Sequence, residues 1–316
     1  MKASAPGKII LFGEHAVVYG QPALAVPVTQ VHVDVEVLDS SRAGVWINAP
    51  GIDLHAKLNS LPADHPIGSI ILKLFSPPFS SPHFLNEKIQ GQRGVEINIV
   101  STIPVASGLG SGAAVSVALI RALALQLAYP LTNEQVNELV FEIEKLHHGT
   151  PSGIDNMVIT YAKPVYFIKG QPVEIFTVGK PFTIVIGDTG IPALTKESVG
   201  DVRNLWLKDK ASFENLFNEI GHIALKARNL IENGTSELLG ELMDRNHALL
   251  QDITVSSPEL DQLVLAARVA GAIGAKLSGG GRGGNMIALV EPAKAESVAS
   301  ALITAGAKRT IITEIK

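Results

Sequence analysis

The stretch PVASGLGSGAA (residues 104–114) lies between a strand expected at Val95–Val100 and a helix expected at Ser111–Ala128. Glycines let a ligand approach the backbone closely, and the first turn of a helix carries free N–H groups with a partial positive charge. Both features are typical of a phosphate-binding turn. The alternative interpretation is that these small residues only allow tight packing of the helix.

This turn does not have a Walker sequence, because no Gly-Lys-Ser/Thr follows it. Gly108, Gly110 and Ala113 match the dinucleotide-binding fingerprint, which requires a second strand after the helix, ending in an acidic residue. Here a second helix is expected instead. It starts at Thr132, which has capping-box spacing to Gln135. A dinucleotide oxidoreductase is therefore disfavoured.

A second glycine-rich loop occurs in KLSGGGRGGN (residues 276–285), and the apolar strand Met286–Val290 follows it. The dinucleotide fold needs a helix at that point, so it is disfavoured a second time. A plain turn needs far fewer glycines than this loop has, and glycine is costly to order. The loop predicts close backbone approach to a phosphate, with a flexible hairpin tip as the alternative.

The stretch APGKIILFGEHAVVYG (residues 5–20) begins with a predicted strand. Lys8 shares a face with Ile10 and Phe12, so its ammonium group either reaches water or meets a buried carboxylate. Glu14 and His15 follow in a glycine-flanked turn, where ligand-binding residues are common. Taken alone, the stretch indicates a binding loop without specifying its ligand.

Residues 144–156 (EKLHHGTPSGIDN) contain two carboxylates of interest. Glu144 borders the buried stripe of its predicted helix and is placed to bind a hard cation such as Mg2+, although it is equally explained as a solvated charge. Asp155 lies in a loop, where a capping role is the simple alternative. His147 and His148 are adjacent and point apart on a helix, which disfavours a metal site between them.

Composition limits the class of protein. The chain has 316 residues, 46% of them hydrophobic, a net charge of -4 and no cysteine. Disulfides and thiol catalysis are therefore excluded, and no basic field favours nucleic acid or an anionic membrane. The apolar window Ala113–Tyr129 is interrupted by Arg121 and is too short to span a bilayer. We expect a cytoplasmic protein with a small-molecule partner. The sequence leaves open whether the protein forms a homodimer.

The order of predicted elements suggests two α+β domains, residues 1–179 and 180–316. The first contains strands at Lys8–Phe12, Val31–Leu38 and Val95–Val100. The second starts with a strand at Phe182–Ile186 and three helical stretches between about residues 201 and 270. It closes with strand, glycine loop, strand, helix and strand.

Together, these segments resemble the motifs of the GHMP small-molecule kinases, in the same order and across nearly the whole chain. The stretch at residues 5–20 resembles that of the mevalonate kinases within this family. The resemblance implies a ribosomal-protein-like N-terminal domain and a ferredoxin-like C-terminal domain. It also implies ATP and mevalonate as substrates, with Mg2+ as cofactor.

The resemblance assigns roles by position in the motifs. Asp155 matches the catalytic aspartate and Lys8 the lysine beside it, while Ser111 and Glu144 match the magnesium-binding pair. Positions near the substrate are matched by Glu14, His15, Ser152 and Thr195. The nucleotide-binding positions are Pro104, Ala106, Ser107, Gly108, Leu109, Gly110, Ser111, Gly112 and Ala113, with Gly279, Gly280 and Gly281 in the last loop.

Three positions depart from the family pattern. Gly112 stands where mevalonate kinases commonly have a second serine, which removes one hydroxyl from the metal-binding turn. Arg282 and Asn285 stand where glycine and cysteine are more usual, and Arg282 is a candidate for an additional phosphate contact. Other GHMP kinases, with phosphomevalonate, homoserine or galactose as substrate, and a non-catalytic sensor on the same fold are the remaining alternatives.

Overall fold

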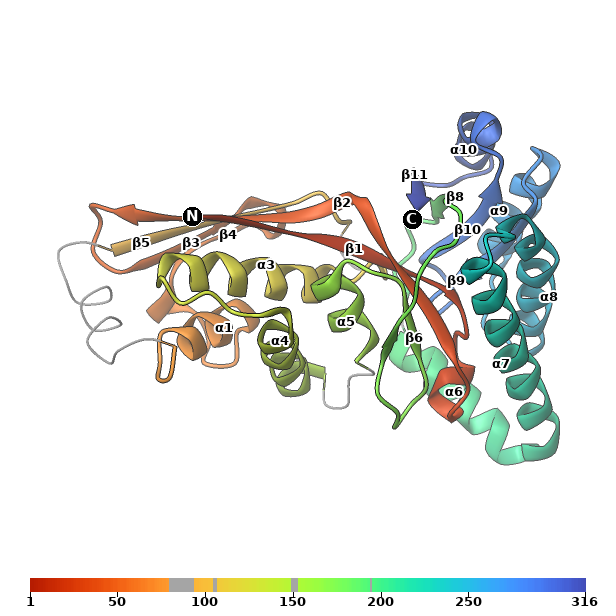
Figure 1. Ribbon diagram of the computed structural model, residues 1–316, viewed down its shortest axis with the longest axis horizontal. Helices are drawn as coiled ribbons and strands as arrows, with labels where there is room; N and C mark the ends of the chain where they lie inside the picture. Colours follow the sequence, from red (N-terminus) through yellow and green to blue (C-terminus); the bar gives the residue numbers. More distant parts are fainter. Residues whose placement is uncertain (80–93, 105–106, 149–152, 194) are drawn as a thin grey trace. The chain divides into compact units, whose positions relative to one another are not determined.

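The computed structural model describes residues 1–79, 94–104, 107–148, 153–193 and 195–316 (Figure 1). It divides into two compact units that are not consecutive in the chain. The first unit comprises residues 1–7, 31–104 and 110–162, and the second comprises residues 8–30, 105–109 and 163–316. The chain changes unit inside β1 (Lys2–Phe12) and β2 (Ala23–Ser40). The boundary between residues 179 and 180 stays a prediction.

The first unit is a sheet with helices on one face, as Figure 1 shows. Its strand order is β4-β3-β5-β2, and β1 also pairs with β2. The pair β3–β5 is parallel, whereas β2–β5 and β3–β4 are antiparallel. The further elements are β3 (Val45–Ala49), β4 (Leu54–Lys57), α1 (Pro66–Leu74), β5 (Gly94–Ser101), α3 (Ser111–Gln126), α4 (Asn133–His148) and α5 (Ile154–Tyr161).

The α4 helix shows how sequence pattern determined local structure here. Thr132 and Gln135 form the expected capping box, with the Thr132 N–H donating to Oε1 of Gln135 at 2.9 Å and the Gln135 N–H donating to Oγ1 of Thr132 at 3.3 Å. Its predicted apolar stripe is buried, at Val136, Leu139, Val140 and Ile143. Glu138 and Glu142 are exposed, whereas Glu144 is half-buried at the border of the stripe.

The second unit contains a four-stranded antiparallel sheet with the order β11-β8-β10-β9. Counted along the chain, this is the order 4-1-3-2 of a ferredoxin-like sheet. It confirms the expected ending of strand, loop, strand, helix and strand. The elements are β6 (Val165–Phe167), β7 (Glu174–Ile175), β8 (Phe182–Asp188), α6 (Thr195–Lys208), α7 (Lys210–Glu232), α8 (Leu239–Asp252), α9 (Pro258–Val269), β9 (Gly274–Ser278), β10 (Asn285–Val290), α10 (Ala295–Thr304) and β11 (Arg309–Ile315).

Residues 195–270 form four helices, so the expectation of three helical stretches was wrong. Asp209 separates the first two, because its side chain accepts a hydrogen bond from the Ser212 N–H at 3.2 Å and so caps a new helix. No helix in the described ranges has the length and hydropathy that crossing a membrane needs.

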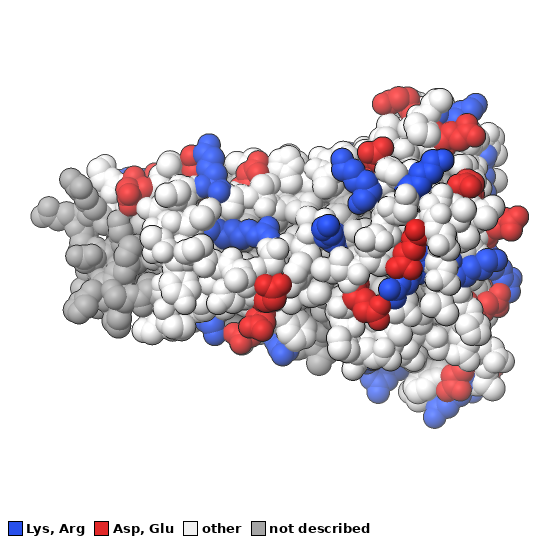
Figure 2. All heavy atoms as spheres, in the orientation of Figure 1, with Lys and Arg blue, Asp and Glu red and all other residues white. Residues whose placement is uncertain are grey.

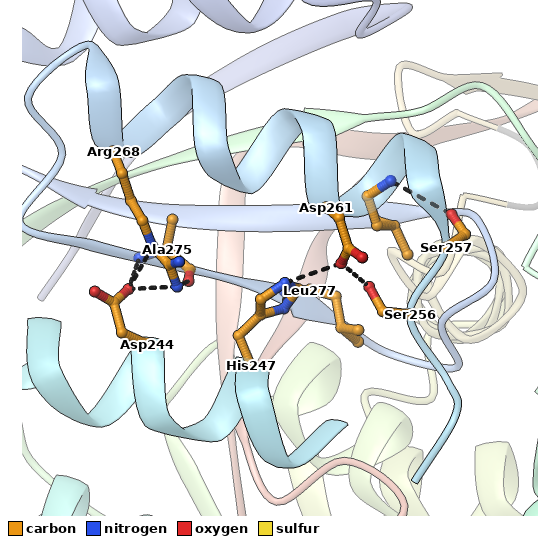
Figure 3. Close-up of polar contacts among 9 residues, drawn as sticks. Asp244, His247, Ser256, Ser257, Asp261, Arg268, Ala275 and Leu277 are labelled. Carbon is orange, nitrogen blue, oxygen red and sulfur yellow. Dashed lines mark hydrogen bonds and ion pairs between the residues drawn. The ribbon is translucent and has the colours of Figure 1, made fainter. Parts of the chain in front are cut away.

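The strand β9 lies at the edge of its sheet, and side chains from α8 and α9 satisfy its outer backbone groups (Figure 3). Asp244 accepts from the Ala275 N–H at 2.9 Å, and Arg268 donates to the Ala275 carbonyl at 3.0 Å. His247 accepts from the Leu277 N–H through Nδ1 at 3.3 Å. Exposed strand edges invite pairing with other chains, and these side chains cover this one. They also fix β9 immediately before the glycine loop.

Charge is spread over the surface. Figure 2 shows acidic and basic side chains interspersed on the face that it draws. Among the described residues of that face, no extended field of one sign is visible. This agrees with the small net charge of -4.

Candidate active site

Parts of the three segments, at residues 8–20, 107–109 and 276–285, meet within the second unit. The Lys8 N–H donates to the Leu109 carbonyl at 2.9 Å, which joins the first segment (residues 5–20) to the 104–114 turn. Asn285 donates through Nδ2 to the Ser107 carbonyl at 2.5 Å, which joins that turn to the last loop. Ser278 donates through Oγ to the Ile10 carbonyl at 2.7 Å, which joins the last loop to the first segment. Segments up to 268 positions apart therefore form one cluster.

Lys8 is buried in β1, with 6% of its surface exposed. The alternative that Lys8 extends its ammonium group to water is therefore wrong, because such a lysine exposes that group. Gly13 allows the tight turn after this strand: it has φ +95°, and a Cβ there would lie 2.3 Å from the Pro22 carbonyl oxygen. The strand and the turn together place Glu14 and His15 inside the unit.

Glu14 forms an ion pair with Lys276, and both side chains are fully buried. Lys276 also donates to its neighbour's carbonyl, on Leu277, at 2.6 Å. Burial raises the pKa of Glu14 and lowers the pKa of Lys276, and in each case the attraction between the two groups opposes the effect. Lys276 was not among the site residues predicted from the sequence. The available signal was a lysine between Ala275 and Leu277 in a predicted strand.

His15 lies 3.0 Å from the Gly280 carbonyl oxygen through Nε2. A carbonyl only accepts, so Nε2 carries the proton and Nδ1 is an acceptor. Burial lowers the pKa of His15 to about 4, and the nearby charge of Arg282 acts in the same direction. His15 is therefore neutral at pH 7. Its Nδ1 is buried and has no hydrogen-bond partner among the described residues.

The last glycine loop packs against other parts of the unit so closely that side chains are excluded. A Cβ at Gly280 would lie 2.5 Å from Oγ1 of Thr195. A Cβ at Gly281 would lie 1.9 Å from the Val255 carbonyl oxygen. Thr195, the first residue of α6, is exposed beside this loop. The structure thus brings together Thr195, Gly280 and His15, which the sequence had placed near the substrate or the nucleotide.

Two glycines of the 104–114 turn adopt a left-handed backbone conformation. Gly108 has φ +80° and Gly110 has φ +77°, both in the left-handed region that favours glycine. Gly110 is the N-cap residue of α3 and makes no side-chain capping hydrogen bond. Gly112 is exposed, and a Cβ there would meet no atom within 4 Å, so the position has room for the serine that the family commonly carries.

Three predicted residues lie in the first unit, on three packed helices. Ser111 begins α3, Glu144 lies near the end of α4, and Asp155 lies in the first turn of α5, all half-buried. The expectation that Asp155 lies in a loop was wrong, because α5 already begins at Ile154. The helix α5 is held to α4 by the hydrogen bond from Asn156 Nδ2 to Asn137 Oδ1 at 2.7 Å. Ala106 and Ser152 fall outside the described residues, as do the side chains of the two adjacent histidines, His147 and His148.

A hydroxyl and a carboxylate, such as those of Ser111 and Glu144, are oxygen donors that suit Mg2+. Among the described residues, no group of three or more acidic or histidine side chains could hold a metal ion. Magnesium does not need such a group, because it commonly takes one or two protein ligands together with water and substrate phosphates. The donor set therefore fits Mg2+.

The chain resembles known kinases over its whole length. Family models match residues 80–163, as the GHMP kinases N terminal domain, and residues 227–308, as the GHMP kinases C terminal. The mevalonate kinase of Thermococcus sibiricus is 37% identical, covering 99% of this chain and 95% of that protein. The mevalonate kinase of Pyrococcus abyssi is 38% identical, covering 96% and 92%. The crystal structure of L. major mevalonate kinase in complex with R-mevalonate has a TM-score of 0.84 and 30% identity, covering 100% of this chain and 96% of that one.

Proposed function

This chain belongs to the GHMP kinases and, among them, to the mevalonate kinases, and we propose that it transfers the γ-phosphoryl group of Mg-ATP to the hydroxyl of mevalonate. The product is 5-phosphomevalonate, an intermediate of isoprenoid biosynthesis. ATP and mevalonate are both water-soluble anions, which fits the cytoplasmic location expected from the sequence.

One observation carries the proposal. Three glycine-rich segments, separated by up to 268 positions in the chain, are joined by hydrogen bonds in one unit. Glycine-rich turns expose backbone N–H groups, and such groups bind phosphate. A cluster of this kind suits a reaction in which positioning and charge neutralisation carry most of the catalysis, as in phosphoryl transfer.

Asp155 is the proposed proton acceptor. The hydroxyl oxygen of mevalonate attacks the γ-phosphorus, the bond from that phosphorus to the β–γ bridging oxygen breaks, and ADP leaves. The hydroxyl proton passes to the Asp155 carboxylate. Lys8 contributes a positive charge where negative charge develops on the transferring group. No covalent enzyme intermediate is required.

Ser111 and Glu144 would hold the magnesium ion. When bound, Mg2+ neutralises negative charge on the β and γ oxygens of ATP. The turn at residues 107–110 and the loop at residues 279–281 bind the phosphates through the backbone.

The Glu14–His15 turn supports the choice of a polyhydroxy acid as substrate. Neutral His15 presents Nδ1 as a buried acceptor, which suits a substrate hydroxyl that donates a hydrogen bond. Thr195 and Ser152 contribute further hydroxyl groups. A buried acceptor of this kind discriminates against analogues that lack the hydroxyl, because it would then be left unpaired.

The test is an ADP-release assay with Mg-ATP and four alternative acceptors: mevalonate, phosphomevalonate, homoserine and galactose. We expect turnover of mevalonate alone, with 5-phosphomevalonate identified by mass. Activity on another acceptor would retain the kinase and overturn the substrate. Nucleotide and mevalonate binding without turnover of any acceptor would favour the non-catalytic sensor.

A further inference from the structure

Arg282 connects three separate parts of the second unit. It lies in the glycine loop between β9 and β10, and its N–H donates to the Val255 carbonyl at 2.8 Å. Its Nε donates to the Thr254 carbonyl at 3.3 Å, and its Nη1 pairs with Asp201 Oδ2 on α6. The glycine loop, the turn between α8 and α9, and α6 are thus joined through a single residue.

The backbone at this junction is strained. Arg282 has φ +57° and Thr254 has φ +65°. Residues other than glycine avoid this left-handed region, and β-branched threonine is especially disfavoured there. Neighbouring positions of the same loop carry glycine, which adopts such angles freely. An arginine at this point therefore has an energetic cost that a glycine would not have.

The ion pair between Arg282 and Asp201 does not stabilise the fold enough to offset that cost. The side chains of Arg282 and Asp201 are 36% and 54% exposed, and exposed ion pairs contribute little to folding. Residues that are held in strained conformations without a gain in stability cluster at functional sites. The contacts of Arg282 therefore suggest a role in the site.

These contacts of Arg282 hold the glycine loop close to α6. Gly280, two positions before Arg282, lies against Thr195 and accepts a hydrogen bond from His15. Asp201 lies six residues after Thr195 on α6, about 9 Å along the helix axis at 1.5 Å per residue. The Arg282–Asp201 pair is thus a second attachment between the loop and the helix that begins with Thr195.

We propose that Arg282 and Asp201 form a clasp that positions Thr195 and the glycine loop for phosphoryl transfer, with Arg282 acting as a positioning residue. This rests on the proposed kinase function. It replaces the hypothesis of a phosphate contact, because the guanidinium group of Arg282 is directed to Asp201 and to the Thr254 carbonyl.

The test compares Arg282→Gly, Asp201→Asn and the double variant with the wild-type chain. Glycine at position 282 relieves the strain and removes the clasp, so we expect an unchanged or higher Tm. We expect kcat to fall between about 10-fold and about 100-fold in each single variant, because small displacements of positioned groups have effects of that size. The KM for ATP should stay within about twofold of the wild-type value. The kcat of the double variant should be no lower than that of the poorer single variant.

A matched control is Glu219→Gln, which removes one partner of the exposed pair that Arg245 and Glu219 form at 2.6 Å between α8 and α7. It should leave kcat and Tm unchanged. Equal kcat in the two clasp variants and the wild type would overturn the proposal. So would a Tm that falls together with kcat, or an ATP KM raised by Arg282→Gly but not by Asp201→Asn, which would indicate a direct phosphate contact.

Hydrogen exchange separates the clasp from the proposed function. We expect faster exchange at residues 195–201 and 279–284 in both single variants, with no change in the control. If the wild-type chain has no activity on mevalonate, the proposed function fails and exchange still tests the clasp. Unchanged exchange at both segments would overturn it.

Discussion

Replacing Lys276 with methionine should destabilise the protein strongly, because it leaves the buried charge of Glu14 without its ion-pair partner. Both side chains are fully buried, and Oε2 of Glu14 has no hydrogen-bond partner among the described residues. Removing one partner of a buried ion pair costs about 3 to 5 kcal/mol. The total free energy of unfolding of a domain is about 5 to 15 kcal/mol, so the loss is a large fraction of it.

The double variant Glu14→Gln/Lys276→Met removes both charges and should be more stable than Lys276→Met alone. The matched control is Lys226→Met on α7, where the lysine is exposed and the expected change lies within about 0.5 kcal/mol. Urea denaturation followed by circular dichroism measures the free energy of unfolding of each variant.

The loss should also depend on pH. Without Lys276 the pKa of Glu14 rises further, so the folded state binds a proton more readily than the unfolded state. The deficit of Lys276→Met relative to the wild type should therefore shrink as the pH falls from 8 to 5. A loss below about 1 kcal/mol that is independent of pH would refute the reasoning, because it would mean that Glu14 is not a buried carboxylate in need of a partner.

Three further outcomes are expected. Asp155→Asn should lower turnover by roughly 100-fold to 10,000-fold while ATP binding stays unchanged, since it removes the proton acceptor and little volume; near-normal turnover would falsify the assigned role. Gly112→Ser should stabilise α3 by about 0.5 kcal/mol, as measured by urea denaturation, because serine favours a helix more than glycine does and the site is open. It should also lower the Mg2+ concentration for half-maximal rate, because the hydroxyl adds a ligand. A higher Mg2+ concentration for half-maximal rate would count against Mg2+ at this turn. Burial lowers the pKa of both His15 and His247 to about 4, so as the pH falls the unfolded state binds protons before the folded state does. The free energy of unfolding should therefore decrease as the pH drops from about 6.5 to about 4, by up to about 1.4 kcal/mol per pH unit for each histidine. Urea denaturation between pH 7 and 5 measures this slope, and a flat profile would contradict it.

The sequence by itself determined the features that depend on neighbouring residues. The capping box of Thr132 and Gln135 and the apolar stripe of α4 are confirmed, and glycines of the 104–114 turn adopt left-handed backbone angles. Each follows from helical periodicity or from the conformational freedom of glycine, and these act over a few residues. The three motifs and their order were sufficient to indicate the kinase family.

Only the tertiary structure decided which distant groups meet. Lys276 reaches Glu14 across 262 positions, and Arg282 reaches Asp201 across 81. Asp244, Arg268 and His247 cover the outer edge of β9, and the compact units take segments from several parts of the chain. Such pairings depend on how strands and helices pack. Spacing along a single chain carries no information about them, because each lysine, arginine or aspartate has many oppositely charged residues elsewhere in the sequence with which it could pair. Burial then determined the chemistry: it raises the pKa of Glu14, which would be an ordinary acid in water, and the attraction of Lys276 opposes that rise.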